Sequence, residues 1–291
     1  MTSAHFANSF TGAAHQASST ETRVAARTKL GQFSFINSLP IVLPLMRGEV
    51  ALEADITLAP PSKLNALISE GGLDVSAVSS FEYLSRNDLA FIPDVSISCR
   101  GPVGSVLLFS KHSLEDLAKP ERTLVASAQS ATSINLLRVM MLEQFGTTPR
   151  ITADMSPELE SDQVDGVLVI GDHALEVDTA WSTRHLRIDM GDWWVRTSGL
   201  PMVFGLWAAR MNWIERAATQ YATTSDALRR SKQLGLGRCF EAVLDEAEQR
   251  TGLARTRLKH YYESQIDFNL TPEHLEGLGH YKSLLQKHGL I

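Results

Sequence analysis

From Lys29 onward, the spacing of hydrophobic and polar positions switches repeatedly between the period of a strand and that of a helix. Residues 52–58 alternate between apolar and polar side chains, which is the two-residue period of a half-buried strand. Residues 130–145 instead repeat apolar side chains at helical spacing and end at Gly146, a residue type that commonly closes a helix. Because short strands of this kind follow one another with helices between them, the pattern predicts an α/β protein with largely parallel sheets.

The predicted elements cover the chain from Lys29 to its end. Strands are predicted at residues 29–36, 52–58, 74–78, 91–98, 103–110, 124–126, 164–170 and 202–209. Helices are predicted to begin near Pro40, Ser62, Phe81, Ser130, Phe240 and Pro272. Three tryptophans are predicted to lie in a loop-rich stretch, namely Trp181, Trp193 and Trp194.

Chain length and two extended runs predict a division into two lobes. A chain of 291 residues exceeds the usual size of one domain. The runs at 103–110 and 202–209 are apolar and extended, so we expect the chain to cross between lobes near residues 107 and 201. The predicted division is a disordered tail at 1–28, one lobe formed by 29–107 and 201–291, and a second lobe at 108–200.

Charge and composition exclude several classes of function. The formal charge is −6, from 27 basic and 33 acidic side chains, so no general attraction to nucleic acid or to an anionic membrane is expected. No stretch approaches the ~20 apolar residues that span a bilayer. Cys99 and Cys239 lie far apart and outside any metal-binding pattern, so we expect no disulfide, no metal and no organic cofactor. A cytoplasmic protein is the expectation.

Small hydroxyl and amide side chains gather where predicted strands give way to helices. The four groups are Asn37-Ser38, Ser79-Ser80, residues 101–105 and residues 130–133. A helix N-terminus presents unpaired N–H groups and the positive end of the helix dipole, and a capping hydroxyl there completes a site for a carboxylate or phosphate. Each group taken alone is an ordinary helix cap. Together they predict a site for a small polyanion.

Signatures of the common catalytic classes are absent from the sequence, which has no nucleophile elbow, P-loop or zinc-protease motif. His173 follows a predicted buried strand and is the histidine best placed for proton transfer, with Asp172 just before it. Both residues also suit a structural role, because a carboxylate after a strand can cap the next turn. The residues alone leave this choice open.

Six short motifs follow one another along residues 29–291. They are Phe35-Ile36-Asn37-Ser38-Leu39-Pro40, Ser79-Ser80-Phe81-Glu82-Tyr83 after Asp74, Gly101-Pro102-Val103-Gly104-Ser105-Val106, Ser130-Ala131-Thr132-Ser133, Gly171-Asp172-His173-Ala174-Leu175 and Thr197-Ser198-Gly199-Leu200-Pro201-Met202-Val203-Phe204. In this order they resemble the chorismate dehydratases of the futalosine route to menaquinone, a branch of the type 2 periplasmic-binding-protein fold. The resemblance implies a two-lobed α/β fold with mixed sheets and a ligand cleft between the lobes.

Two positions depart from the family pattern. Ala131 stands where relatives often carry a basic residue, so one carboxylate contact is expected to be weaker or to come from elsewhere. His173 stands where a small residue is commoner.

The resemblance also implies a reaction, in which chorismate loses water to give 3-[(1-carboxyvinyl)oxy]benzoate. A ring proton leaves the carbon that bears the enolpyruvyl ether, and the neighbouring hydroxyl departs as the ring becomes aromatic. By motif position, Asn37 and Ser105 are the implied catalytic pair. The implied substrate-binding residues are Ser79, Ser80, Gly104, Ser130, Thr132, Ser133 and Asp172. The substrate's own enolpyruvyl carboxylate is the hypothesised base, with Glu82 and Asp172 as the protein alternatives.

Three other interpretations remain. The same fold and anion-binding loops suit a non-catalytic binding protein for a small carboxylate. The later naphthoate-forming enzyme of the same route shares the fold, but a Cys-Pro-Asn-Asp type of sequence is expected there in place of Asn37-Ser38-Leu39-Pro40. An effector-binding domain related to LysR-type regulators is disfavoured because no helix-turn-helix pattern precedes Lys29.

Overall fold

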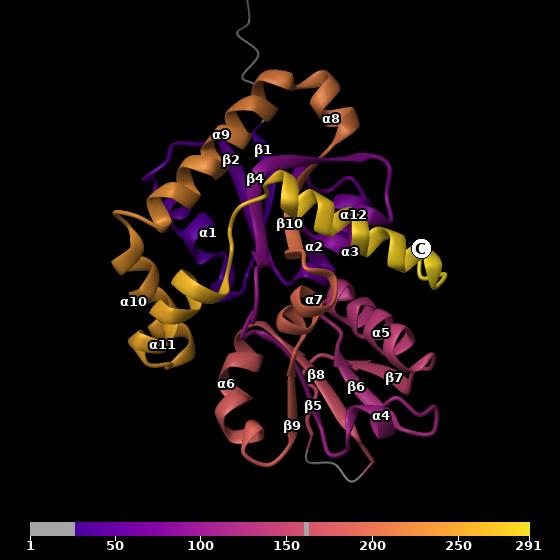
Figure 1. Cartoon of the computed structure of the whole chain (residues 1–291). Helices are drawn as coiled ribbons and strands as arrows, with labels where there is room; N and C mark the ends of the chain where they lie inside the picture. The colour runs from indigo at the N-terminus through magenta and orange to yellow at the C-terminus, as the bar shows by residue number, and fades with distance from the viewer. Residues whose placement is uncertain (1–26, 160–162) are drawn as a thin grey trace, which may run out of the picture.

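The computed structural model describes residues 27–159 and 163–291, which form two lobes, each built on a five-stranded mixed sheet (Figure 1). Most of the predicted tail at 1–28 lies outside the described residues, and Thr28 already belongs to the first strand. The two lobes confirm the fold class.

The first sheet has the strand order β2-β1-β3-β10-β4. Its strands are β1 (Thr28–Phe33), β2 (Ala54–Ala59), β3 (Val75–Ser79), β4 (Leu89–Cys99) and β10 (Met202–Arg210). Strand β1 pairs in parallel with β2 and β3, whereas β10 runs antiparallel to both β3 and β4. A strand from late in the chain therefore lies between two strands from its beginning.

The second sheet has the order β7-β6-β8-β5-β9. Its strands are β5 (Val106–Ser110), β6 (Thr123–Ser127), β7 (Arg150–Asp154), β8 (Gly166–Ile170) and β9 (Leu186–Asp189). Strand β6 pairs in parallel with β7 and β8, and β5 runs antiparallel to β8 and β9. In each sheet four strands point the same way and one, β10 or β5, runs against them, so the sheets are mixed, as the resemblance implies. The expectation of largely parallel sheets fails only at β10 and β5, the strands that enter each sheet after the chain has changed lobes.

Helices cover both sheets. They are α1 (Leu39–Met46), α2 (Pro61–Ser69), α3 (Ser80–Leu84), α4 (Leu114–Leu117), α5 (Ala131–Phe145), α6 (Gly171–Ser182), α7 (Met190–Ser198), α8 (Met211–Arg216), α9 (Ala218–Gly235), α10 (Phe240–Thr251), α11 (Arg255–His260) and α12 (Pro272–Lys287), with a 3₁₀ turn η1 (Ile36–Ser38) and a π-helical turn η2 (Tyr261–Gln265). Helix α5 has the predicted boundaries, because the Ser130 hydroxyl accepts from the Ser133 N–H at its start and Gly146 ends it with a φ of 68°.

The structure corrects the sequence-based prediction of several elements. Trp181 lies in α6, and Trp193 and Trp194 lie in α7, so these tryptophans are helical and not in a loop-rich stretch. Strands β7 and β9 were not predicted, because these short strands lie at the two edges of the second sheet and carry few buried apolar side chains.

The chain passes between the sheets at two short segments. It leaves the first sheet after Cys99, enters the second at Val106, and returns after α7 to begin β10 at Met202. The chain therefore passes from the first sheet to the second within residues 100–105 and returns to the first within residues 199–201. The finer lobe division at 107 and 200 remains a proposal.

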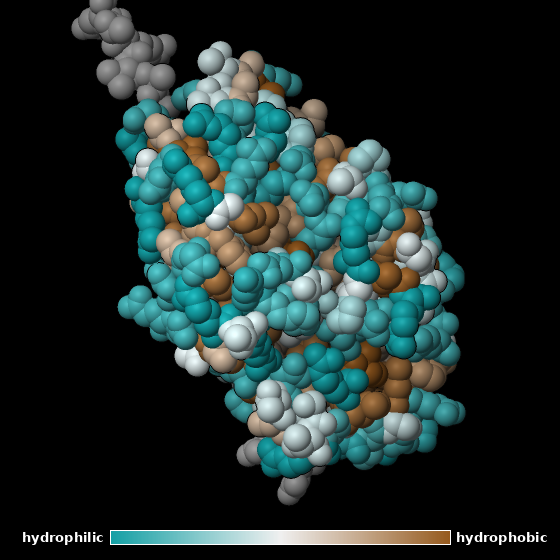
Figure 2. All heavy atoms as spheres, turned by 60° about the vertical axis from the view of Figure 1, so that its left-hand side comes forward, coloured by the Kyte–Doolittle hydropathy of each residue, from teal (hydrophilic) through white to brown (hydrophobic). Residues whose placement is uncertain are grey.

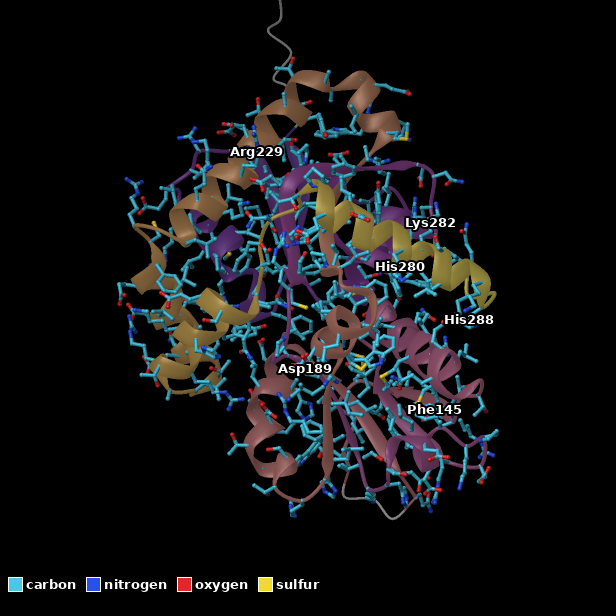
Figure 3. All side chains as sticks on the ribbon, in the orientation of Figure 1. Phe145, Asp189, Arg229, His280, Lys282 and His288 are labelled. Carbon is cyan, nitrogen blue, oxygen red and sulfur yellow. The ribbon has the colours of Figure 1, made fainter. Side chains whose placement is uncertain are left out.

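The C-terminal helix α12 reaches from the first lobe toward α5 of the second lobe (Figure 1). The Tyr281 hydroxyl donates to the carbonyl of Thr132, and Lys287 and His288 both contact the Glu143 carboxylate. Figure 3 shows His288 at the end of this helix, on the α5 side. One helix thus connects the two lobes.

The surface is mainly polar. Figure 2 shows one face covered largely by hydrophilic residues, with hydrophobic side chains visible in separate areas. Exposed large hydrophobic residues such as Met46, Leu58 and Met211 come from different elements. Within the part of the chain that the structure describes, every helix is too short or too polar to cross a bilayer.

Two glycines of α12 allow a direct test of the packing between this helix and the returning chain. A Cβ at Gly277 would lie 2.2 Å from the carbonyl oxygen of Pro201, whereas a Cβ at Gly279 would meet nothing within 4 Å. Gly277→Ala is expected to lower the free energy of unfolding by about 1–3 kcal/mol through overpacking. Gly279→Ala is expected to raise it by about 0.5–1 kcal/mol, because alanine favours a helix. Urea unfolding of both variants measures the difference, and equal effects would contradict the close approach.

Candidate active site

A cavity of about 490 Å³, including its open mouth, lies between the two lobes. The lining comes from both sheets and from the segments that join them. The lining residues are Phe33, Phe35, Asn37, Pro61, Ser79, Ile97, Val103, Ser105, Val106, Ser130, Ser133, Ile170, Gly171, Phe204 and Gly205.

The cavity combines apolar walls with a few uncharged polar groups. Three phenyl rings and several aliphatic side chains form most of the surface. The five polar side chains are those of Asn37, Ser79, Ser105, Ser130 and Ser133. Among the described residues, no charged side chain belongs to the lining. Any anion held here must be bound by neutral donors.

Asn37 lies on η1, directly after β1, and offers the cavity an unused acceptor. The backbone just before Asn37 is held in place, because the Ile36 N–H donates to Asp172 and the Ile36 carbonyl accepts from Tyr262. The Asn37 side-chain oxygen is buried and, among the described residues, has no hydrogen-bond partner. Since a buried polar atom without a partner is costly, this oxygen is suited to a ligand hydroxyl.

The serines at the starts of α3 and α5 are helix caps that also face the cavity. The Ser79 hydroxyl accepts from the Glu82 N–H at 3.2 Å and from the Asn65 amide at 3.0 Å. The hydroxyls of Ser130 and Ser133 lie 2.9 Å apart. The structural role and the proposed binding role therefore coincide in these residues.

Ser105 lies in the segment that carries the chain into the second sheet, just before β5. Its hydroxyl is 2.8 Å from that of Tyr261, and both residues are almost completely buried. The two preceding N–H groups, of Val103 and Gly104, donate to the carboxylate of Asp189 at 3.0 and 2.8 Å. Figure 3 shows Asp189 near the junction of the two lobes. The shape of this segment is thus fixed by a buried carboxylate.

Gly104 itself is outside the lining and has a backbone role. Its φ of 70° is in the left-handed region that favours glycine, and a Cβ there would lie 2.6 Å from the Gln265 amide. The extended strand predicted from residue 103 therefore begins only at Val106, because the turn at Gly104 precedes it.

Three further residues predicted to bind substrate lie outside the cavity lining and connect elements instead. The Ser80 hydroxyl donates to the Val203 carbonyl at 2.6 Å. The Thr132 hydroxyl accepts from the Phe81 N–H, and Asp172 accepts from the Ile36 N–H, both at 3.0 Å. The last two bonds join one lobe to the other.

Asp172 directly follows Gly171, a residue of the cavity lining, and its pKa is shifted. Burial raises the pKa of Asp172 to about 6, and the nearby charge of Glu176 acts in the same direction. The Ile36 N–H and the guanidinium of Arg250 oppose the shift. The neighbouring His173 packs edge-on against Trp181, with ring centroids 5.9 Å apart.

Comparisons with known proteins bear on the chain as a whole. A family model described as menaquinone biosynthesis matches residues 28–287. A curated relative, the chorismate dehydratase of Thermus thermophilus, is 36% identical over 220 residues, which cover 70% of this chain and 76% of the relative. The chain belongs to the menaquinone biosynthesis family.

Solved structures similar to this menaquinone biosynthesis protein show the same fold. A protein from Archaeoglobus fulgidus has a TM-score of 0.74 at 18% identity, covering 90% of this chain and 98% of that one. The periplasmic aliphatic sulphonate binding protein SsuA from Escherichia coli has a TM-score of 0.59 at 13% identity, covering 91% and 93%. The alkanesulfonate-binding protein SsuA from Xanthomonas axonopodis pv. citri, bound to MOPS, has a TM-score of 0.60 at 13% identity, covering 90% and 93%. These likenesses confirm the periplasmic-binding-protein fold.

Sequence reasoning about this family member missed the groups that hold the cavity-lining residues in place. Asp189 is the last residue of β9 and caps α7, and an aspartate directly before a helix is a pattern that the sequence alone can reveal. Tyr261 gave no signal, because its partner Ser105 is 156 positions away in the chain. Within the described residues, no group of three or more His, Cys, Asp or Glu side chains is placed to hold a metal.

The raised pKa of Asp172 predicts a pH-dependent stability difference. The folded state retains this proton up to about pH 6, whereas an unfolded aspartate releases it near pH 4. The contribution of protonated Asp172 to the free energy of unfolding of the wild type is therefore full below about pH 4 and is lost as the pH rises to about 6. Asp172→Asn keeps an oxygen for the Ile36 N–H, so it is expected to match wild type near pH 4 and to exceed it above pH 6, by at most about 3 kcal/mol.

Asp88→Asn is a control of opposite sign for this measurement. The hydrogen bond from Arg86 holds the pKa of Asp88 below its ordinary value, so wild type gains stability from this carboxylate as the pH rises to about 4, and Asp88→Asn should lose stability relative to wild type over that range. Denaturant unfolding between about pH 2 and pH 8 covers the pH ranges in which both variants are expected to respond. A pH-independent difference for Asp172→Asn would exclude the raised pKa.

Proposed function

We propose that this protein is a lyase that removes water from chorismate to give 3-[(1-carboxyvinyl)oxy]benzoate. The observation that carries the proposal is a cavity with phenyl walls and uncharged hydrogen-bonding groups in a chain 36% identical to a chorismate dehydratase. Such a cavity suits a flat ring with polar substituents. We further propose that the protein acts in the cytoplasm, in line with its two free cysteines, Cys99 and Cys239.

Binding of a dicarboxylate by neutral groups requires oriented dipoles. Helices α5 and α6 both begin at the cavity, with Ser130 before the first residue of α5 and Gly171 as the first residue of α6. Their N-terminal N–H groups and dipoles favour a negative charge at these positions. The hydroxyls of Ser130 and Ser133 are proposed to hold one carboxylate, and Ser79 to contribute from the first lobe.

Asn37 and Ser105 are proposed to act on the reacting ring. The unpaired side-chain oxygen of Asn37 is suited to accept from the ring hydroxyl and so orient it. Ser105 is proposed to donate its hydroxyl proton in a hydrogen bond to negative charge that develops during the reaction. Donors fixed in advance at such positions stabilise the transition state more than the ground state.

The base is proposed to be the substrate's own enolpyruvyl carboxylate, folded over the ring. The ring proton passes to this carboxylate, the neighbouring hydroxyl leaves and takes up a proton, and the products are the aromatic ether and water. Glu82 is a poorer candidate, because it lies outside the cavity lining and pairs with Arg86 at 3.3 Å. Asp172 is already held by the Ile36 N–H and is partly protonated near pH 6.

The second candidate function is a non-catalytic binding protein for a small carboxylate. The similarity in fold to two sulfonate-binding proteins favours this alternative. Incubation of the protein with chorismate, followed by chromatography for an aromatic product, separates the two functions.

The proposed roles of Asn37 and Ser105 predict a loss of rate without a loss of fold. Asn37→Ala should keep a near-normal melting temperature, and Ser105→Ala should stay folded with a melting temperature lower by a few degrees, because the buried Tyr261 hydroxyl loses its partner. In both variants chorismate turnover should fall by about 10²–10³-fold, as is typical when a fixed hydrogen-bonding group is removed. Steady-state kinetics and thermal melting measure both quantities. Near-normal turnover of both variants would contradict the assignment, and unfolding would make the residues structural.

Two further variants report on the base within the same experiment. Glu82→Gln and Asp172→Asn are expected to retain substantial turnover if the substrate carboxylate takes the proton. Abolition of turnover by either change in a folded protein would assign the base to that residue.

The proposed chemistry also predicts independence from metal ions, because acid-base assistance and charge stabilisation suffice for the reaction. Turnover is expected to be unchanged within error after exhaustive treatment with EDTA. Loss of activity that one added divalent metal restores would contradict this expectation.

A further inference from the structure

Within residues 27–159 and 163–291, the hydroxyl of Ser105 has one hydrogen-bond partner. Tyr261 donates to the Ser105 oxygen at 2.8 Å. A serine hydroxyl carries one proton and two acceptor lone pairs, so accepting this bond leaves its own proton for another group. Among the described residues, no acceptor for that proton is present, and Ser105 lines the cavity. The free proton is therefore available to a ligand in the cavity.

Tyr261 remains a donor at neutral pH. Burial raises the pKa of its phenol above the ordinary value, and the nearby charges of Asp172 and Asp189 act in the same direction. Both oxygens lie in residues with at most 2% exposure, so water does not compete for the bond. A protonated Tyr261 fixes which of the two hydroxyls donates.

The π-helical turn η2 brings Tyr261 to this position. The turn follows α11, and its first two residues both point inward, with ring centroids of Tyr261 and Tyr262 5.5 Å apart. The Tyr262 hydroxyl donates to the carbonyl of Ile36 at 2.8 Å, just before Asn37. The last residue of the turn, Gln265, packs against Gly104, just before Ser105. One turn thus contacts the chain beside both members of the proposed catalytic pair, and π-helical turns are often found at functional sites.

We propose that Tyr261 is a positioning residue, which holds the Ser105 hydroxyl with its proton directed into the cavity. The inference rests on the proposed function, since Ser105 is assigned there as the donor. Without the phenol, the Ser105 hydroxyl is free to rotate and no longer presents its proton in one direction.

Tyr261→Phe tests the proposal by removing only the phenol oxygen. The expected result is a fall in kcat for chorismate by about tenfold or more with a KM within about twofold of wild type, because the donor is needed most in the transition state. A merely structural bond would lower the melting temperature by a few degrees and leave kcat unchanged.

Tyr281→Phe is the matched control. Tyr281 is also fully buried, and its hydroxyl donates to a backbone carbonyl, that of Thr132, at 3.0 Å. This variant is expected to lose a similar amount of thermal stability and to keep kcat and KM within about twofold. An equal loss of kcat in both variants would show a general effect of destabilisation and would overturn the proposal.

A double-mutant cycle decides whether Tyr261 acts through Ser105. In the Ser105→Ala background the positioned group is absent, so adding Tyr261→Phe is expected to cost no further kcat/KM. The same addition is expected to raise the melting temperature, because it removes a buried hydroxyl that has lost its partner. A full multiplicative loss in the double variant would show that Tyr261 acts independently and would overturn the proposal.

The four proteins of the cycle also separate this inference from the proposed function. If wild type converts chorismate but the two substitutions are not coupled, only the inference about Tyr261 fails. If wild type binds chorismate without converting it, the proposed function fails, and calorimetric dissociation constants replace kcat/KM in the same cycle. If the effects of the two substitutions on the dissociation constant are coupled, the positioning role of Tyr261 is supported. If they are not coupled, or if chorismate does not bind, the positioning role is overturned.

Discussion

The carboxylate of Asp189 holds together the segment on which the cavity depends. It accepts from the N–H groups of Val103 and Gly104 in the first crossing and from those of Gly191 and Asp192 at the start of α7. Burial raises the pKa of Asp189, while these N–H groups favour the charged form. Because Ser105 follows the crossing directly, its position is set by this buried charge and its surrounding amides. Loss of the carboxylate would leave three buried donors and one part-buried donor without this partner, which is costly.

The cavity has to attract an anion in a protein of net charge −6 without a cationic side chain in its lining. Neutral donors meet this requirement because they are fixed by the fold and need little reorganisation when charge develops. The cost is that their orientation must be secured by other residues. Ser79, Ser130 and Ser133 are secured as helix caps or by a neighbouring hydroxyl, whereas Asn37 and Ser105 depend on contacts from the C-terminal turn η2. The site is therefore supported by residues far from it in the sequence.

The sequence predicted those features that depend on local physics. The cap at Ser130 and the helix after it follow from side-chain type and spacing, and so does the cavity position of Ser79 at a strand-to-helix junction. The helical environment of Trp193 was missed, because Gly191, Gly199 and Pro201 are loop signals and helix α7 has only nine residues. Thr132 and Asp172 were predicted to bind substrate, and the structure shows that they form bonds between the lobes, a role that no local sequence pattern reveals. The Tyr261 contact is non-local and required the fold.

The placement of β10 between β3 and β4 has a consequence for the order in which the chain becomes structured. The second sheet uses only residues between Val106 and Asp189, so all its strands are available before the rest of the chain is synthesised. The first sheet lacks an interior strand until β10 emerges, and non-local pairings of this kind form slowly. Domains generally fold as units during synthesis. During translation, β4 is therefore expected to lack its sheet partner β10 beside an already folded second lobe, and its unpaired edges are then open to aggregation.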